Sequence, residues 1–313
     1  EGKRWLDAVP AAFIETQTSR YAKWRVHKSH PDGADVREMI ARDVRRTCDA
    51  AHRQKAENVL LAVTAIERIG YHQGMDYLVA AMLMQKMQEE EAFALLVFAL
   101  TEMHLQGFYL LNTNAFLSDY TKAFEGSFEV QLPQLFANFQ EQGYEPMFYL
   151  VDWFSTMFLR VGGFDLALLV MDLFYAGVDE VLFRVALAIL KLLEPELLEL
   201  SFDELANLRS MVQTLDEETI ILTALNIELK RGSCMLATLR KKHSAAFASA
   251  KSSRTPLKNV QAAGNEEDVA AVNRKRELVT AVYLPLLTAA RKKLEAEEAA
   301  RRQLKDDDEG GTG

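Results

Sequence analysis

The apolar segments of this chain are long and seldom interrupted. Its 313 residues include only 15 glycines and 7 prolines, and 49% of them are hydrophobic. Within several segments the apolar residues recur at helical spacing; residues 75, 78, 79, 82 and 83, for example, fall on one face of a helix. Few breakers and this periodicity are typical of helical proteins. We therefore predict an all-α fold, built as one large helical domain or as two smaller ones.

The expected helices follow from these segments and from the breaks between them. We expect helices over 4–30, 36–52, 58–69, 91–103, 115–142 (one or two helices around Pro133), 144–159, 165–177 and 178–193. Breaks are expected at 30–35 and at Glu194-Pro195. A further helix is expected after Ser201, an N-cap candidate with Glu204 at the capping-box position.

The composition changes near residue 250, where small and polar residues dominate. We therefore expect a main domain over 1–250, a linker over 251–267, an additional C-terminal helical segment over 268–305 and a disordered tail over 306–313. We also expect the C-terminal segment to pack back onto the domain through its apolar residues. These residues are Val279, Val282, Leu284 and Leu287.

Composition also limits the partner and the compartment. The net charge of −9 disfavours nucleic acid as the main partner, although a basic cluster lies between Arg37 and Lys55. Two cysteines, Cys48 and Cys234, form no disulfide framework and fit a reducing compartment. No run reaches transmembrane length, so we expect a cytoplasmic protein that is at most peripheral on endomembranes. The chain begins at Glu1 without a methionine, as a fragment of a longer protein would.

The sequence contains no motif that would bind a nucleotide or carry out a hydrolysis unaided. The patterns GxxxxGK[ST], GxGxxG, GxSxG and HExxH are all absent. His27 and His30 are three residues apart, but no further histidine or cysteine joins them at useful spacing. We therefore expect neither a metal site nor a cofactor of the chain's own.

One informative stretch is "IARDVRRT", residues 40–47. Ile40, Asp43 and Thr47 fall on one helix face, and the Asp43 carboxylate is close enough to Arg46 to orient its guanidinium group. The plainer alternative is a surface ion pair with no further role. Arg45 is a competing candidate, but it points about 100° around the helix from Arg46.

The other informative stretch is "GYHQGM", residues 70–75. Gly70 and Gly74 bracket Tyr71 and Gln73, and two glycines let the backbone turn sharply or approach another surface closely. Gln73 is therefore presented just before the helix that starts at Met75. The alternative is that Gln73 caps the backbone of that helix. In GTP hydrolysis an arginine neutralises developing phosphoryl charge and a glutamine orients the attacking water.

Taken together, "I-x-x-D-x-x-R-T" and "G-Y-x-Q-G-M" closely resemble the two signature motifs of TBC domains, which are GTPase-activating proteins for Rab-family small GTPases. Residues 132–158 resemble the family's segment leading to its tryptophan-containing helix, and 169–190 resemble a helix pair that follows. The resemblance covers most of residues 4–235. It implies a single large multi-helix TBC-type domain, to which the C-terminal helix is an addition.

The resemblance also implies a mechanism. Arg46 matches the family's arginine finger and Gln73 its glutamine finger, and both would enter the active site of a GTP-bound Rab in trans. Asp43 and Tyr71 would hold the two fingers in place. The remaining motif residues would support them: Ile40, Thr47, Gly70, Gly74 and Met75. GTP and Mg²⁺ would be carried by the partner, so the chain would activate a GTPase in vesicle trafficking rather than hydrolyse GTP alone.

The sequence departs from the family pattern at a few positions. Met171 stands where tryptophan is frequent, His72 where cysteine is common, and Arg45 where proline is frequent. These departures leave open a second hypothesis, a catalytically inactive TBC-like module that binds a small GTPase or scaffolds a membrane-trafficking complex. A helical adaptor unrelated to GTPases is disfavoured by two motifs in the right order.

Overall fold

The fold is known from a computed structural model, which describes residues 3–27, 34–67, 69–103, 105–109, 114–178, 180–229 and 241–242. Every regular element in these ranges is a helix, which confirms the predicted all-α class. The linker, C-terminal helical segment and tail expected over 251–313 lie outside the described residues. Among the described helices none is long and apolar enough to span a bilayer.

The elements of the first half of the chain are α1 (Lys3–Asp7), α2 (Ala11–His27), α3 (Ala34–Thr47), α4 (Arg53–Glu67), α5 (Met75–Met84), α6 (Glu89–Thr101) and the 3₁₀ helix η1 (Leu105–Phe108). Those of the second half are α7 (Asn114–Gln131), α8 (Pro133–Gln142), α9 (Met147–Ser155), α10 (Leu159–Tyr175), α11 (Val181–Leu197), α12 (Phe202–Leu205), α13 (Leu208–Val212) and α14 (Glu217–Asn226).

Two of the expected helix boundaries are wrong, and both lie at a proline. The helix expected over 4–30 is divided into α1 and α2, because Pro10 has no N–H to continue the hydrogen-bond ladder. The break expected at Glu194-Pro195 is absent, since α11 continues to Leu197 with Pro195 inside its last turn. There the proline removes only the bond to the Lys191 carbonyl, at an exposed position close to the helix end.

The capping box expected at Ser201 is confirmed at the start of α12. The Glu204 carboxylate accepts a hydrogen bond from the Ser201 backbone N–H at 2.9 Å, and Ser201 caps the N-terminus in return. The first turn of α6 has the same arrangement, with Gln88 N–H donating to Glu91 at 2.8 Å. Such caps fix where these helices begin.

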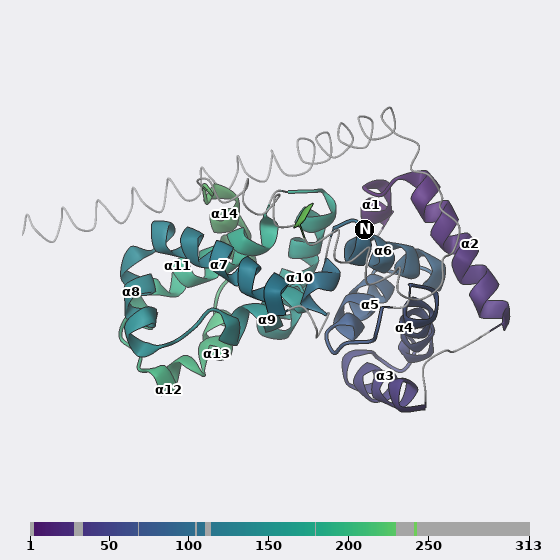
Figure 1. Ribbon diagram of the computed structural model, residues 1–313, viewed down its shortest axis with the longest axis horizontal. Coiled ribbons are helices and arrows are strands. Elements are labelled where there is room, and N and C mark those ends of the chain that lie inside the picture. The colour runs from purple at the N-terminus through teal and green to yellow at the C-terminus, as the bar shows by residue number, and fades with distance from the viewer. Residues whose placement is uncertain are drawn as a thin grey trace, which may run out of the picture.

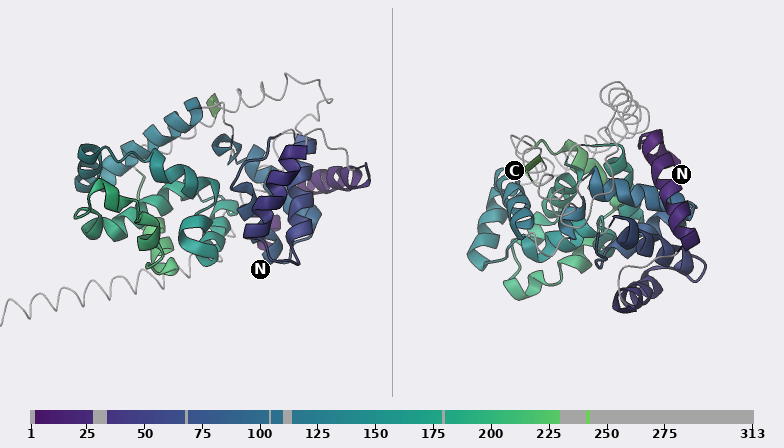
Figure 2. Two further views of the ribbon diagram at one scale, coloured as in Figure 1. Left: turned by 90° about the horizontal axis from the view of Figure 1, so that it is seen from below. Right: turned by 45° about the vertical axis from the view of Figure 1, so that its right-hand side comes forward.

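Helix α10 joins two groups of helices. It packs against α1 and α5 on one side and against α9, α11, α13 and α14 on the other. Figure 1 shows α1 to α6 at one end of the molecule and most of α7 to α14 at the other, and the view from below in Figure 2 shows the same division. A single hydrophobic core nevertheless runs through both groups.

Aromatic side chains fill the core between α7, α9 and α11. The rings of Phe154 and Phe183 stack with centroids 5.9 Å apart. Tyr120 and Phe124 meet Phe183 edge-on, at 4.7 and 5.3 Å. Such offset and edge-to-face arrangements are the ones that aromatic quadrupoles favour. This cluster therefore fixes the C-terminal end of α9, where Ser155 lies close to Gly74.

Candidate functional site

Helix α3 presents Arg46 at its C-terminal end. Its apolar face is fully buried through Ile40 and Val44, so the opposite face points outward. Arg45 and Arg46 occupy the last turn and Asp35 the first, a charge order that complements the helix dipole. The side chain of Arg46 is 61% exposed. Arg46 is therefore placed where another molecule can reach it.

A buried carboxylate holds Arg46. Asp43 is only 3% exposed, and its Oδ1 accepts a hydrogen bond from Nη2 of Arg46. Its other oxygen, Oδ2, accepts from the Tyr71 hydroxyl at 3.0 Å. A charge-assisted bond to a buried acid restricts the guanidinium more than a bond between exposed groups does. Asp43 thus connects the end of α3 to the loop that precedes α5.

Tyr71 and Asp76 extend this connection to Gly74. The Tyr71 hydroxyl also lies 3.3 Å from Asp76 Oδ1, and that oxygen accepts the Gly74 N–H at 2.9 Å. Burial, followed by the two carboxylates, raises the pKa of Tyr71, so the phenol stays a donor. Burial also raises the pKa of Asp76, while bonds from Gly74 N–H and the Thr47 hydroxyl lower it.

Gly74 is the position in this loop that requires glycine. Its φ is +115°, a conformation that residues with a side chain rarely adopt. A Cβ there would lie 3.3 Å from the Ser155 carbonyl oxygen and 3.5 Å from the Tyr109 ring. Gly70 differs, because a Cβ at that position would meet only the His72 ring, at 4.0 Å. The close approach expected for both glycines is therefore found at Gly74.

The side chain of Gln73 is exposed at the tip of the loop. Gly74 is the N-cap of α5, and no side chain caps that helix end. Within the described part of the chain, no hydrogen bond to the Gln73 side chain is found. The alternative in which Gln73 caps its own helix does not match this geometry. Its amide is left to face outward.

These groups line one small hollow of about 200 Å³. The lining residues are Asp43, Arg46, Thr47, Gln73, Asp76, Tyr77, Arg160 and Arg209. The other motif residues lie around it: Ile40, Tyr71 and Met75 are buried beneath, and Gly70 and Gly74 flank the loop. Arg45 is exposed but does not line this hollow.

Sequence reasoning missed four of the lining residues: Asp76, Tyr77, Arg160 and Arg209. Asp76 had a local signal, since it stands in the first turn of α5 and can accept from the N–H groups that begin a helix. Arg160 and Arg209 had none. They come from α10 and α13, far along the chain, and only the packing of these helices brings them to the loop.

A tight turn between α9 and α10 places Arg160. Met157 and Phe158 have φ values of 49° and 63°, unusual for residues with side chains, and both are buried. The Phe158 N–H donates to the Trp153 carbonyl at 2.7 Å, which closes the turn. Across it, Arg160 Nη1 donates to Asp152 Oδ1 at 2.6 Å.

Cys48, two residues after Arg46, is not placed to act as a nucleophile. It is buried, and burial raises the pKa of its thiol to about 11. The thiolate, which is the reactive form, is therefore scarce at neutral pH. Among the described residues, the hollow offers three arginines, a glutamine and buried acids, and no activated nucleophile.

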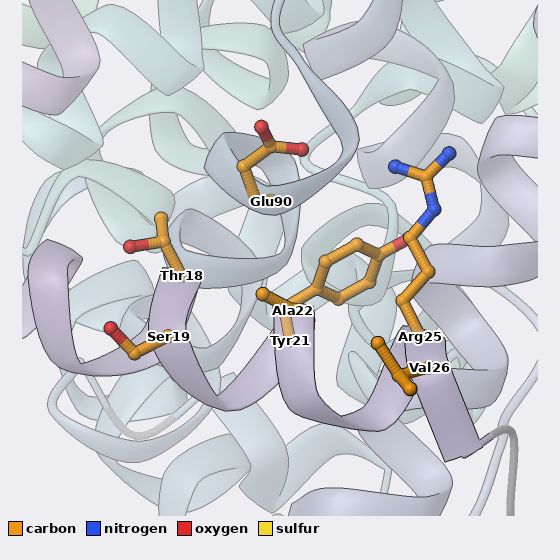
Figure 3. Close-up of a pocket in the computed structure, with 7 residues that line it drawn as sticks. All are labelled: Thr18, Ser19, Tyr21, Ala22, Arg25, Val26 and Glu90. Atoms are coloured by element: carbon orange, nitrogen blue, oxygen red, sulfur yellow. The ribbon is translucent and has the colours of Figure 1, made fainter.

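A larger hollow of about 610 Å³ lies elsewhere, along the outer face of α2. Figure 3 shows its lining residues, all from α2 except Glu90 of α6. The Tyr21 hydroxyl at its floor donates to Glu89 at 2.6 Å, and burial raises the pKa of this phenol. No residue of either sequence motif lines this hollow, so its size does not make it the candidate site.

Comparison with known proteins agrees with the two motifs. Residues 14–198 match the sequence model of the Rab-GTPase-TBC domain family. Human TBC1 domain family member 14 is 33% identical over 178 residues, which cover 55% of this chain and 25% of that protein. The human Ecotropic viral integration site 5 protein homolog is 32% identical over 175 residues, covering 53% and 21%. TBC1 domain family member 12 of Xenopus tropicalis is 37% identical over 138 residues, covering 44% and 20%.

The aligned region spans about a quarter or less of the length of these curated relatives. Among solved structures, the crystal structure of the Chlamydomonas flagellar RabGAP TBC domain superposes with a TM-score of 0.59. That match covers 73% of this chain and 81% of the other, at 22% sequence identity, and it shows a shared fold.

Proposed function

Because this chain belongs to the Rab-GTPase-TBC domain family, we propose that it activates a GTP-bound Rab-family GTPase by supplying Arg46 and Gln73 to the partner's active site. The observation that carries the proposal is the network around Asp43. One buried carboxylate binds Arg46 and also Tyr71, in the loop that presents Gln73. Arg46 and Gln73 are both exposed and line the same hollow. Arg46 is hydrogen-bonded to the buried Asp43, and the Gln73 amide has no hydrogen bond among the described residues.

Each group has a defined role in GTP hydrolysis. A water oxygen attacks the γ-phosphorus, the bond to the bridging oxygen breaks, and GDP and inorganic phosphate leave. The guanidinium of Arg46 would neutralise the negative charge that develops on the transferring phosphoryl group and the bridging oxygen. The Gln73 amide would orient the attacking water. An arginine in this role is worth about 10³–10⁵ in rate, or roughly 4–7 kcal/mol of barrier.

Asp43 and Tyr71 would act as positioning residues in this scheme. Neither needs to touch the nucleotide, because Asp43 holds the guanidinium and Tyr71 ties Asp43 to the loop. The nucleotide and its Mg²⁺ would belong to the GTPase. This chain would supply no cofactor of its own.

Single-turnover GTP hydrolysis across a panel of GTP-loaded Rabs tests the proposal. We expect the unaltered chain to accelerate hydrolysis by one or a few Rabs. Arg46→Ala should lose about 10³–10⁵ of that acceleration, and Gln73→Ala about 10²–10³. Matched controls are Arg45→Ala, on the same helix turn, and Gln54→Ala, on the exposed start of α4; both should keep the full rate.

One outcome would overturn activation. If GTP-loaded Rabs bind the unaltered chain but none is hydrolysed faster, the chain is a GTPase-binding module without catalytic effect. Binding insensitive to Arg46→Ala and Gln73→Ala would support that alternative further. If Arg45→Ala loses activity while Arg46→Ala keeps it, the arginine finger is Arg45 and not Arg46.

A further inference from the structure

The hollow contains three arginines, and only one of them comes from the signature motifs. Arg46 is paired with Asp43, and Arg160 is paired with Asp152 at 2.6 Å. Arg209 is exposed on α13, and within the described residues no carboxylate pairs with it. Of the three arginines, Arg209 is therefore the one whose charge is left to pair with a carboxylate of another protein.

The acids of the hollow are beneath its surface rather than at its opening. Asp43 and Asp76 are 3% and 1% exposed and already accept hydrogen bonds from Tyr71, Arg46 and the Gly74 backbone. Among the residues that line the hollow, the exposed charged groups are guanidinium groups, and the one nearby partly exposed acid, Asp152, is paired with Arg160. In a chain with a net charge of −9, this is a local positive surface. Such a surface attracts acidic groups at short range.

Tyr77 is near both the arginines and a buried acid of the hollow. It is half-buried and lines the hollow. Burial, and after it Asp76, raises the pKa of Tyr77, while Arg160 and Arg209 act in the opposite direction. Both guanidinium groups are thus near enough to the phenol to affect it. Arg209 faces the same opening as Arg46 rather than a separate part of the surface.

Arg209 reaches that opening from a different group of helices than Arg46 does. Arg46 ends α3, which belongs to the first group of helices, whereas Arg209 belongs to α13 in the second group, as Figure 1 shows. In the proposed activation, the guanidinium of Arg46 contacts the phosphoryl group and is therefore not available for a second contact. A second exposed arginine at the same opening, supplied by another helix, would then meet the protein surface that borders the nucleotide pocket.

We propose that Arg209 is a specificity-determining contact, which pairs with a carboxylate on the surface of the GTPase beside its nucleotide pocket. This inference rests on the proposed GTPase activation and adds a reason for choosing among GTPases. A Rab with an acidic side chain at the facing position is favoured, and one with a lysine or arginine there is repelled. Arg160 is a weaker candidate for this role, because Asp152 already neutralises part of its charge.

The test is steady-state kinetics on the Rab that the unaltered chain accelerates most. Arg209→Glu should raise KM for the GTP-loaded Rab about tenfold and leave kcat within about twofold, because a contact at the rim changes association rather than chemistry. Arg209→Ala should raise KM about threefold. The matched control is Lys191→Glu, the same charge reversal at an exposed site on α11 outside the hollow.

The dependence of kcat/KM on ionic strength distinguishes a charge contact with the GTPase from a purely structural role of Arg209. The value of kcat/KM for the unaltered chain should fall as ionic strength rises, and this dependence should be weaker in Arg209→Ala. Far-UV circular dichroism and the thermal midpoint of each variant check that it is folded. A lysine substitution of the facing carboxylate on the Rab should restore activity to Arg209→Glu.

The outcomes separate the two proposals. If Arg209→Glu and Lys191→Glu give the same KM on an accelerated Rab, the contact is overturned while activation stands. If Arg209→Glu lowers kcat and leaves KM unchanged, Arg209 acts in the chemical step and not in docking. If the unaltered chain accelerates no Rab, activation fails first, and the inference built on it fails with it.

Discussion

At the scale of single residues, Gly74 has the tightest constraint in the site. Gly74→Ala would place a Cβ 3.3 Å from the Ser155 carbonyl oxygen at a φ of +115°. We expect this change to lower the free energy of unfolding by about 1–3 kcal/mol. It should also reduce GTPase activation, because the shifted loop carries Gln73. Urea denaturation and the single-turnover assay measure the two effects.

Gly70→Ala is the matched control for that prediction. A Cβ at Gly70 would meet only the His72 ring, at 4.0 Å, so we expect a change within about 0.5 kcal/mol. Equal stability of the two variants would contradict the argument that Gly74 alone is constrained.

The residues of the site were predictable from sequence only where the pattern is local. Asp43 and Arg46 are three apart on one helix, and that spacing alone predicts that they meet. Tyr71 and Asp43 are joined by a hydrogen bond between elements, which spacing cannot supply. Arg209 is placed by the docking of α13 against α10, so no pattern near residue 209 indicates it.

At the scale of elements, one hydrogen bond attaches the first helix to the middle of the fold. Trp5 Nε1 in α1 donates to Asp172 Oδ1 in α10 at 2.6 Å, and the Trp5 ring stacks on Tyr175. Trp5→Phe keeps an aromatic ring but removes the donor. We expect a loss of about 1–3 kcal/mol in the free energy of unfolding, as for a hydrogen bond to a charged group.

A double-mutant cycle isolates that bond. Trp5→Phe, Asp172→Ala and the double variant should show a coupling of about 1 kcal/mol or more by urea denaturation. Strict additivity of the two single changes would mean that the contact contributes nothing to stability, and that α1 is attached by ring packing alone.

The helices themselves were mostly predictable, because their apolar periodicity is strong. The errors arose where one residue changed the outcome. Pro10 divides a segment expected to be continuous, while Pro195 is tolerated near the end of α11. The kink at Gly163, where φ is +83°, falls between the helices expected over 144–159 and 165–177, so the glycines there did indicate a change of direction. Periodicity shows which residues face the core, but not where the backbone bends.

At the scale of the whole molecule, the fold depends on one continuous core. Phe183 is fully buried and contacts the rings of Tyr120, Phe124 and Phe154 from two other helices. Phe183→Ala should lower the free energy of unfolding by about 3–5 kcal/mol, since the cavity cannot close within so many rings. Urea denaturation followed by circular dichroism and by tryptophan fluorescence measures the loss.

The fluorescence signal also tests whether the core is continuous. Trp5 and Trp24 lie among the first helices, whereas Trp153 lies in α9 beside the aromatic cluster. In a Trp153→Phe background, fluorescence reports from the first helices alone, and its midpoint should still shift with Phe183→Ala. A midpoint that does not move would show that the two groups of helices unfold separately.

The hydrogen bonds from Arg46 through Asp43, Tyr71 and Asp76 to Gly74 are all formed within the chain itself. The conformational entropy of arranging these groups is therefore lost during folding and not during docking. In the proposed activation, an encounter with a GTPase would need to immobilise little more than the ends of Arg46, Gln73 and Arg209. More of the contact energy would then be left to stabilise the reacting state, so that a short-lived complex would still be an effective one.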